Sequence, residues 1–477
     1  MRTIKMAAAR VGRFCRPLIR PARKLLLPRG SAASTATNAL TYQESLFNVP
    51  ETKVSQLKNG LAVASEDSGI GTCTVGLWID SGSRFETLET NGVAHFLEHM
   101  AFKGTNRRSQ TQLELEIENM GGHLNAYTSR EQTAYYAKVF SKDLPQAVDI
   151  LSDMLLDSTL GEREIQRERS VILREMQEVE TQVEEVIFDH LHSIAYQDTP
   201  LGWTILGPSE NIRSISRKDL VDYISTHYTA PHMVLAAAGG VSHEELVSLA
   251  EKHFAGLSSR DEYVDITPCR YTGSETRIRD DDMPYAHVVI AVEGVGWAHP
   301  DYIPLMIASM LVGNWDRSLG SGTQMASRLA QHVASGSSAR GFMSFNTCYT
   351  DTGLWGIYFV ADRMHIDDFV WKVQEEWKHI CTHVTEAEVA RARNVFKTSL
   401  FMQLDGSTPV CEDIGRQMLT YGRRIPLPEL DYRIEQVDAK AVRDVMARYL
   451  RDKSPTVVAI GPIEQLPDYT HIRANMS

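Results

Sequence analysis

Two histidines, His95 and His99, have the type and spacing that a metal site needs. On a helix, side chains four residues apart leave the same face one turn apart, so both imidazoles can reach a single ion. Glu98 comes just before His99 and can lean toward the same point without being a ligand. Two imidazoles, a further carboxylate and an open position for water form a hydrolytic zinc site, with a second carboxylate as the base. The spacing therefore indicates metal-assisted hydrolysis.

The same pattern also arises by chance. The chain has 16 histidines among 477 residues, and random placement gives this pattern in roughly a few per cent of such chains. A histidine on a helix is usually a satisfied core or surface residue. The surroundings favour a helix, because Asn91-Gly92 leads into the pattern and Lys103-Gly104 ends it. Taken alone, the pattern leaves a metal site and a pair of structural histidines both open.

Further acids follow in a glutamate-rich segment, 161–194, which predicts one long helix. Glu168 and Glu175 are seven residues apart and share a face of that helix, although a solvated acidic face is the simpler interpretation. Glu185 and Asp189 fall on roughly the same face, so a continuous helix would carry four acids along ~30 Å. Such a stripe beside a metal favours a cationic peptide, because a carboxylate can bind a guanidinium group through two hydrogen bonds.

The elements that must position these side chains fall into two similar halves. Residues 287–292 form an apolar run that matches the run at 74–79, and residues 456–462 echo residues 234–240. We therefore predict an α+β fold of two similar α/β halves, each a mostly antiparallel sheet with helices packed on it.

We expect the two halves to differ in chemistry. The predicted boundaries are 44–255 for a zinc-binding half, 256–268 for a linker and 269–477 for a second half. The second half contains no His-x-x-Glu-His pattern, so we predict that it is not catalytic.

Composition bounds the class of protein. A hydrophobic content of 43% and a charged content of 23% are typical of a soluble globular chain. The sequence has no apolar run near the ~18 residues that a membrane span needs. The six cysteines are scattered without a Cys-x-x-Cys pair, which argues against a disulfide scaffold and against thiolate zinc ligands.

The N-terminal arm has a different composition from the rest. Residues 1–30 carry nine Arg and Lys, and no acidic residue precedes Glu44. This predicts a mitochondrial transit peptide over 1–43, with a nucleic-acid-binding arm as the alternative. A cut after Gly30 would leave Arg29 two residues before the bond. Without the nine basic residues the net charge falls from −12 to −21, which suits a cationic partner and disfavours nucleic acid.

Four segments together carry a resemblance to a known family. They are 91–105, 125–133, 168–178 and 405–416. These segments resemble the pitrilysin-type metallopeptidases, whose metal motif is the inverted His-x-x-Glu-His, and within them the presequence-processing enzymes of mitochondria. The likeness covers nearly all of residues 45–470. Gly122 stands where alanine is usual in the family, and the sequence after Ile472 departs from the family pattern.

The resemblance implies a role for each candidate site residue. It implies one Zn²⁺ per chain on His95, His99 and Glu175. It implies Glu98 as the general base and Glu168 as an acid that supports a ligand. It also implies an edge strand that pairs with extended substrate, an apolar contact for the residue after the cut, and acids for an arginine two residues before it. The residues matched to substrate binding are Phe102, Asn125, Ala126, Tyr127, Glu185 and Asp189.

The resemblance further implies an endopeptidase that removes presequences from imported precursors in the mitochondrial matrix. Its partners would be basic presequence peptides and an α subunit with a long glycine-rich loop. This chain has only a broken glycine-rich stretch at 313–322, which is unlike the α type. Its metal motif is also intact, and both features indicate the β type. The alternative is a structural core subunit of the cytochrome bc1 complex, which shares the fold, and one chain can serve both roles.

Overall fold

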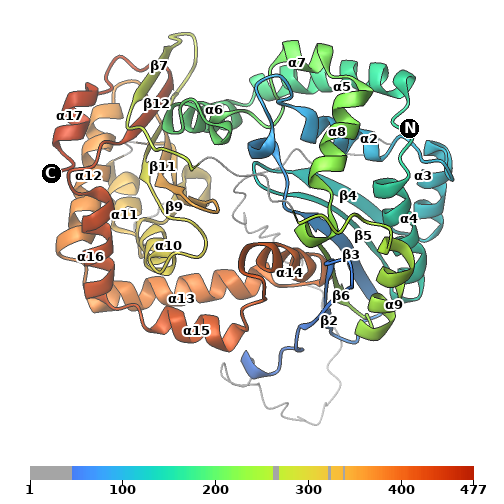
Figure 1. The fold of residues 1–477 in the computed structure, drawn as a ribbon. Coiled ribbons are helices and arrows are strands. Elements are labelled where there is room, and N and C mark those ends of the chain that lie inside the picture. The colour runs from blue at the N-terminus through green and yellow to red at the C-terminus, as the bar shows by residue number, and fades with distance from the viewer. Residues whose placement is uncertain (1–45, 262–267, 321–323, 337–338) are drawn as a thin grey trace, which may run out of the picture.

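The computed structural model describes residues 46–261, 268–320, 324–336 and 339–477. The predicted transit peptide and its cut after Gly30 lie outside these residues, as does part of the predicted linker. Figure 1 shows two halves, each with its own sheet. Within the described ranges, no helix is both long and apolar enough to cross a membrane.

The first sheet has six strands in the order β1-β2-β6-β3-β5-β4. Its one parallel pairing joins β2 to β6, and the other pairings are antiparallel. The strand β4 therefore lies at an edge and pairs with β5 alone. The bounds are β1 Lys53–Gln56, β2 Ala62–Asp67, β3 Thr72–Ile79, β4 His123–Thr128, β5 Thr133–Phe140 and β6 Met233–Gly239.

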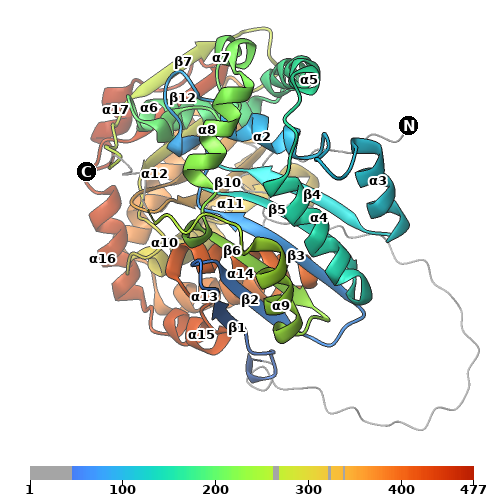
Figure 2. The same ribbon diagram turned by 45° about the vertical axis from the view of Figure 1, so that its right-hand side comes forward.

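Helices of the first half cover one face of this sheet. Figure 2 shows α4, α8 and α9 in front of the strands, and α2 joins them in one large apolar core. The bounds are α2 Val93–Ala101, α3 Gln110–Asn119, α4 Leu144–Leu156, α5 Glu162–Glu180, α6 Val183–Ala195, α7 Ser209–Ser214, α8 Arg217–His227 and α9 His243–Phe254.

The second sheet repeats this plan in the order β7-β12-β8-β11-β10-β9. Its strands are β7 Glu275–Arg279, β8 Ala286–Glu293, β9 Asn314–Asp316, β10 Gly341–Cys348, β11 Gly353–Ala361 and β12 Thr456–Gly461. The helices are α10 Tyr302–Val312, α11 Arg328–Gly336, α12 Ile366–Thr382, α13 Glu386–Gln403, α14 Ser407–Tyr421, α15 Leu427–Glu435, α16 Ala439–Leu450 and α17 Tyr469–Ala474.

Among the described residues, five strands of one sheet correspond to five of the other, and only the edge strands β1 and β9 have no counterpart. The parallel pair β2–β6 of the first sheet matches the parallel pair β7–β12 of the second. The antiparallel run β6-β3-β5-β4 matches β12-β8-β11-β10. The matching apolar runs in the sequence lie in β3 and β8 and in β6 and β12, which occupy equivalent places in the two sheets. The prediction of two similar α+β halves is therefore confirmed.

The halves exchange one helix each. Helix α6 belongs to the first half in sequence, yet its Ile187 and Leu191 lie in a core with residues of the second sheet. Helix α14 belongs to the second half in sequence, yet its Ile414 packs on the first sheet beside Trp78. At Gly415 a Cβ atom would lie 2.1 Å from Trp78 Cδ2, so the close approach of α14 to the sheet requires glycine there. Figure 1 shows both helices between the two halves.

The prediction of one continuous helix over 161–194 is wrong. Helix α5 ends at Glu180 and α6 begins at Val183. Between them, Gln182 has non-helical angles, φ −96° and ψ 89°. The break is needed because α5 packs on α2, whereas α6 packs on the second sheet. Tertiary packing has here overridden a strong local helix preference, and the four acids therefore do not form one stripe.

Charged groups also bind the halves together, where the β4–β5 turn meets the β10–β11 turn. Arg84 Nη1 lies 2.6 Å from Glu131 Oε1 and 2.8 Å from Asp351 Oδ1. The backbone N–H of Thr350 also donates to Glu131, at 3.0 Å. The Arg84 side chain is 1% exposed. Removing one partner of such a buried group leaves a charge without compensation, which typically costs about 3–5 kcal/mol.

Candidate metal centre

Helices α2 and α5 bring the three predicted ligands together. One ligand atom each from His95, His99 and Glu175 lies within 4.8 Å of the others. Glu175 Oε2 is 3.2 Å from His99 Nε2 and 3.9 Å from His95 Nε2. The histidines lie one turn apart on α2, as the sequence predicts, and Glu175 reaches them because α5 packs against α2.

The chemistry of these donors fits a divalent metal ion. Burial lowers the pKa of His95 to about 3, so its ring is neutral, which is the form that binds a metal. His95 Nδ1 is buried and has no hydrogen-bond partner in the described chain. Two imidazole nitrogens and one carboxylate oxygen are a ligand set that proteins use for catalytic transition metals.

Glu168 orients one of the imidazoles. Its Oε2 is 3.2 Å from His99 Nδ1, and its Oε1 is 2.7 Å from Lys103 Nζ. Burial raises the pKa of Glu168, but the hydrogen bonds from His99 and Lys103 outweigh this and hold it below its ordinary value. The ionised carboxylate can only accept, so His99 donates from Nδ1 and directs Nε2 toward Glu175.

His99 itself carries a proton in the metal-free protein. Burial acts to lower its pKa, but hydrogen bonds to Glu168 and Glu175 outweigh burial and raise the pKa to about 9. The proton lies among the same ring and carboxylate atoms that would hold a cation. Binding of a metal ion therefore replaces one positive charge by another.

Glu98 lies at the metal centre without joining the three candidate ligands. Its side chain is buried, and burial raises the pKa of its carboxyl to about 7, against the opposing effects of Thr128 and His99. A carboxyl group with a pKa near the working pH can both accept and return a proton. Its position and its pKa therefore suit an acid–base role.

The candidate substrate residues of β4 lie on the free edge of the first sheet. Ala126 points into the core beneath α2, whereas Tyr127 lies on the opposite face and accepts a hydrogen bond from Trp78. The N–H of Ala126 is taken by the side-chain oxygen of Asn125, at 2.9 Å. Phe102, just after α2, is half-buried against the same core as Ala126.

The structure places Glu185 and Asp189 on α6, apart from the helix that carries Glu175. Asp189 Oδ1 is 2.7 Å from Nη2 of Arg130, whose side chain is 5% exposed. Arg130 Nε also donates to the carbonyl of Leu201, at 3.2 Å. This internal partner of Asp189 was not predicted from the sequence. The pairing brings together the turn after β4 and a helix on the second sheet, and no local pattern reports such a contact.

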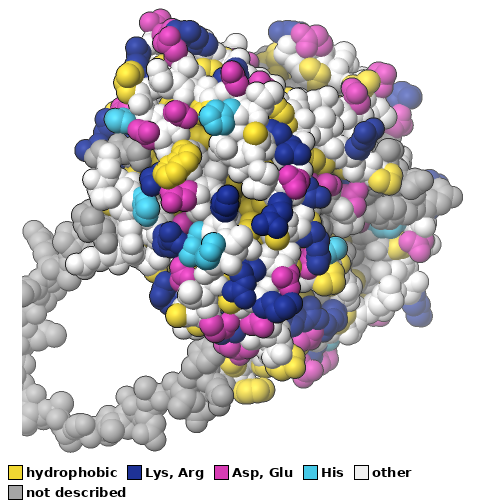
Figure 3. All heavy atoms as spheres, turned by 90° about the vertical axis from the view of Figure 1, so that its left-hand side faces the viewer, with side chains coloured by type: hydrophobic (Ala, Val, Ile, Leu, Met, Phe, Trp, Pro, Cys, Tyr) yellow, Lys and Arg dark blue, Asp and Glu magenta, His cyan; other side chains and the backbone are white. Residues whose placement is uncertain are grey.

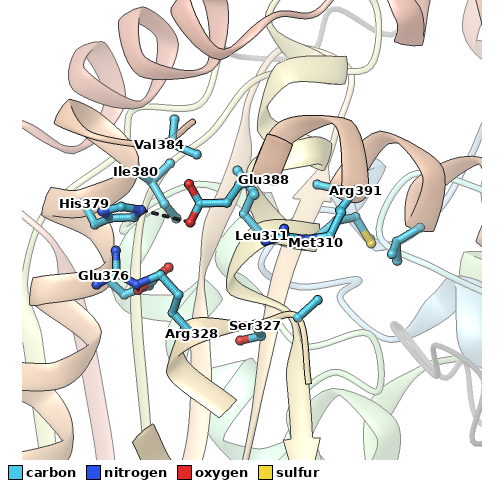
Figure 4. A pocket seen from close by; sticks show the side chains of 13 residues that line it. Met310, Leu311, Ser327, Arg328, Glu376, His379, Ile380, Val384, Glu388 and Arg391 are labelled. Atoms are coloured by element: carbon cyan, nitrogen blue, oxygen red, sulfur yellow. Dashed lines mark hydrogen bonds and ion pairs between the residues drawn. The ribbon is translucent and has the colours of Figure 1, made fainter. Parts of the chain in front are cut away.

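The second half has a different set of side chains at the corresponding place. Helices α10, α12 and α13 enclose a cavity of about 30 Å³ there, shown in Figure 4. His379 Nε2 lies 3.2 Å from Glu388 Oε1, and Arg328 Nε lies 3.7 Å from Glu376 Oε2. A cavity lined by one imidazole and two arginines cannot supply the ligand set of the first half.

Comparison with known proteins agrees with this division. Residues 62–209 match the family described as "Insulinase (Peptidase family M16)", and residues 214–396 match "Peptidase M16 inactive domain". The chain belongs to peptidase family M16 and is a metallopeptidase, and this family implies a bound metal.

Individual members of the family narrow the comparison to mitochondrial proteins. The chain is 62% identical to human "Mitochondrial-processing peptidase subunit beta", over 96% of this chain and 94% of that one. The bovine protein of the same name is 65% identical, over 90% and 88% of the two chains. Human "Cytochrome b-c1 complex subunit 1, mitochondrial" is 52% identical, over 97% and 98%.

A solved structure shows the same fold. A chain of "Complex III2 from Candida albicans, Inz-5 bound" superposes with a TM-score of 0.80 at 26% identity. The match covers 89% of this chain and all of that one.

The ligand assignment predicts the metal content of variants. The substitution His99→Ala removes one of three donors and should abolish stoichiometric metal binding, measured by mass spectrometry of the purified protein. His287→Ala is the matched control, because His287 lies in the second half and bonds to Tyr358. The control should retain its metal. One metal ion per chain in the His99→Ala protein would contradict the assignment.

The buried carboxyl group of Glu376, which lines the cavity in Figure 4, should make the stability of the fold depend on pH. Burial raises the pKa of Glu376 from 4.5 to about 7, so the folded state binds more protons than the unfolded state between these values. Stability therefore falls as the pH rises through this window, by up to about 3 kcal/mol. Glu376→Gln should gain in melting temperature over the wild type between pH 5 and pH 8. Glu375→Gln, at a more exposed site, should keep the wild-type pH dependence.

Proposed function

We propose that this chain is the catalytic β-type subunit of a zinc endopeptidase that removes N-terminal presequences from precursors imported into mitochondria. The observation that carries the proposal is the convergence of His95, His99 and Glu175 beside the buried carboxyl group of Glu98. The two relatives that are 62% and 65% identical support it, because both are named as mitochondrial-processing peptidase subunits. Zn²⁺ suits this ligand set, which leaves a fourth position open.

The mechanism assigns separate tasks to the side chains. Zn²⁺ on His95, His99 and Glu175 would supply the Lewis acid that makes water a nucleophile near neutral pH. Glu98 takes a proton from the attacking water and returns it to the leaving amine. Glu168 keeps His99 in the tautomer that leaves Nε2 free. Burial of these groups keeps bulk water away and strengthens their electrostatic interactions.

Substrate binds along β4 as an added strand in this proposal. An edge strand offers unpaired backbone groups on its outer side. Because the side chain of Asn125 occupies the N–H of Ala126, it must swing aside to admit the substrate backbone. Phe102 contacts the residue after the cut. Glu185 and Asp189 bind the arginine two residues before it, with Asp189 sharing its charge between this guanidinium and Arg130.

The remaining assignments follow from the same proposal. Residues 1–43 form the transit peptide, 44–255 the catalytic half, 256–268 the linker and 269–477 the non-catalytic half. The chain works in the mitochondrial matrix with an α subunit that carries a glycine-rich loop. Its acidic charge suits basic presequences and not nucleic acid. On the face in Figure 3, acidic and basic side chains are intermixed, unlike the basic stripe of a nucleic-acid-binding surface.

A structural role in the cytochrome bc1 complex is the second candidate. It is supported by the relative that is 52% identical and by the fold of the complex III chain. A purely structural subunit has no physical need for two histidines and two carboxyl groups at one point. The peptidase therefore stands first, and the two roles are separated by what co-purifies: a soluble homologue, or cytochromes b and c1.

If Glu98 is the base, a substitution there should affect the rate of peptide cleavage and leave metal binding intact. Glutamine has nearly the same shape as glutamate but cannot accept a proton, so Glu98→Gln should keep its metal and lose ~10²–10⁴-fold in kcat. The assay is cleavage of a presequence peptide by the chain combined with its α partner, with metal content measured in parallel. Near-normal turnover would show that another group is the base.

The acids of α6 predict a loss of specificity. The Glu185→Gln, Asp189→Asn double variant should lose roughly 30- to several-thousand-fold in kcat/KM on peptides with arginine two residues before the cut. It should lose little on the matching alanine peptide. Asparagine keeps one oxygen for Arg130, and an unchanged melting temperature checks this. Equal slowing on both peptides would place the arginine site elsewhere.

A further inference from the structure

One part of the first sheet is only partly covered on the side that α14 occupies. Helix α14 covers β2, β3 and β6, whereas Tyr127 of β4 and Tyr136 of β5 pack at the margin of the apolar cluster that α14 forms with this sheet and stay partly exposed. Trp78 and Tyr136 stack, with ring centroids 6.4 Å apart and planes within 12°. The hydroxyl of Tyr127 accepts the indole N–H of Trp78, at 3.2 Å. Trp78 is itself buried, so it fixes the two tyrosine rings from below, and these two rings form a small aromatic surface.

Glu412 of α14 stands beside this surface, because the preceding residue, Cys411, packs in one apolar cluster with the tyrosines. Its side chain is exposed to solvent, and its negative charge adds to the burial that raises the pKa of both Tyr127 and Tyr136. The two phenols therefore share one carboxylate as their neighbour, and this carboxylate comes from a helix of the other half of the chain.

The nearby cations of the chain are already engaged. Arg416 lies 3.3 Å from Asp413 and places its guanidinium 5.4 Å from the centre of the Trp297 ring. Arg424 is paired with Asp413, at 3.2 Å, and with Glu66. The charge of Arg416 also acts on Glu412, where it opposes the effect of burial on the pKa of this carboxyl. Among the described residues, however, no Lys or Arg is close enough to Glu412 to form an ion pair, so its carboxylate keeps a solvent-facing side next to the two phenol rings.

The pleat of β4 determines which substrate side chains reach this surface. Asn125 and Tyr127 point to the α14 side, whereas Ala126 and Thr128 point to the side of α2 and Glu98. A strand added to the edge shares the alternation, because its side chains also point to opposite faces in turn. Every second residue of such a strand therefore faces Tyr127 and Glu412.

We propose that Glu412, together with the rings of Tyr127 and Tyr136, binds a Lys or Arg side chain of the extended substrate. The bound residue alternates with those that face Glu98. A cation gains from a carboxylate and from the faces of aromatic rings together. This site is separate from the acids of α6, and it rests on the proposed function, because it needs a peptide along β4.

The test is a scan of a basic presequence peptide, in which each Lys or Arg is replaced in turn by norleucine. Cleavage is measured with the chain combined with its α partner. In the wild type, one position or positions two residues apart should lose about 3- to 30-fold in kcat/KM through this site. In Glu412→Gln this loss should vanish at those positions, while the loss at the arginine two residues before the cut remains.

Three further variants sharpen the result. Tyr136→Leu should weaken discrimination at the same positions as Glu412→Gln, because it removes one ring of the site. Glu412→Lys should reverse the preference there. Asp368→Asn removes a charge from the exposed side of α12 and should leave the whole scan unchanged.

Two results would overturn the assignment of Glu412. Glu412→Gln could keep the wild-type scan, or it could slow every peptide by the same factor at an unchanged melting temperature. Failure of the proposed function gives a different result: the wild-type complex would then cleave none of the peptides, and the assignment would fall with it.

Discussion

Each sheet has two apolar faces, and the helices of its own half cover only one of them. This constraint shapes the rest of the molecule. The other face of the second sheet is covered by α6 and that of the first sheet by α14, so each half completes the core of the other. Burying apolar surface is the main favourable term in folding, and neither half can gain all of it alone.

The metal centre depends on how buried charges are balanced. His95 is neutral, His99 lies between two carboxylates, and Lys103 compensates Glu168. The second half repeats the order of five strands, but its cavity is lined by one histidine and two arginines, of which Arg328 faces Glu376. The two halves thus share a fold while differing in chemistry, because the chemistry depends on a few side chains.

Much of this architecture was predictable from the sequence. The spacing of His95 and His99 defined a helical face, and apolar runs defined the matching strands β3 and β8. The failures share a cause. The end of α5 at Glu180 and the pairing of Arg130 with Asp189 both depend on the second sheet, which is far away in sequence. Local patterns report the structure that neighbours in sequence build, and long-range packing can override them.

The exchanged helices have a consequence for the integrity of the chain. A single cut of the backbone between α9 and β7 would yield two fragments, and each would still hold a helix embedded in the core of the other. Separating them would expose apolar surface on both sheets and would leave Asp351 without its partner Arg84. The two fragments of a cut molecule should therefore stay together as a non-covalent complex. The two exchanged helices hold the halves together more than the covalent link between them does.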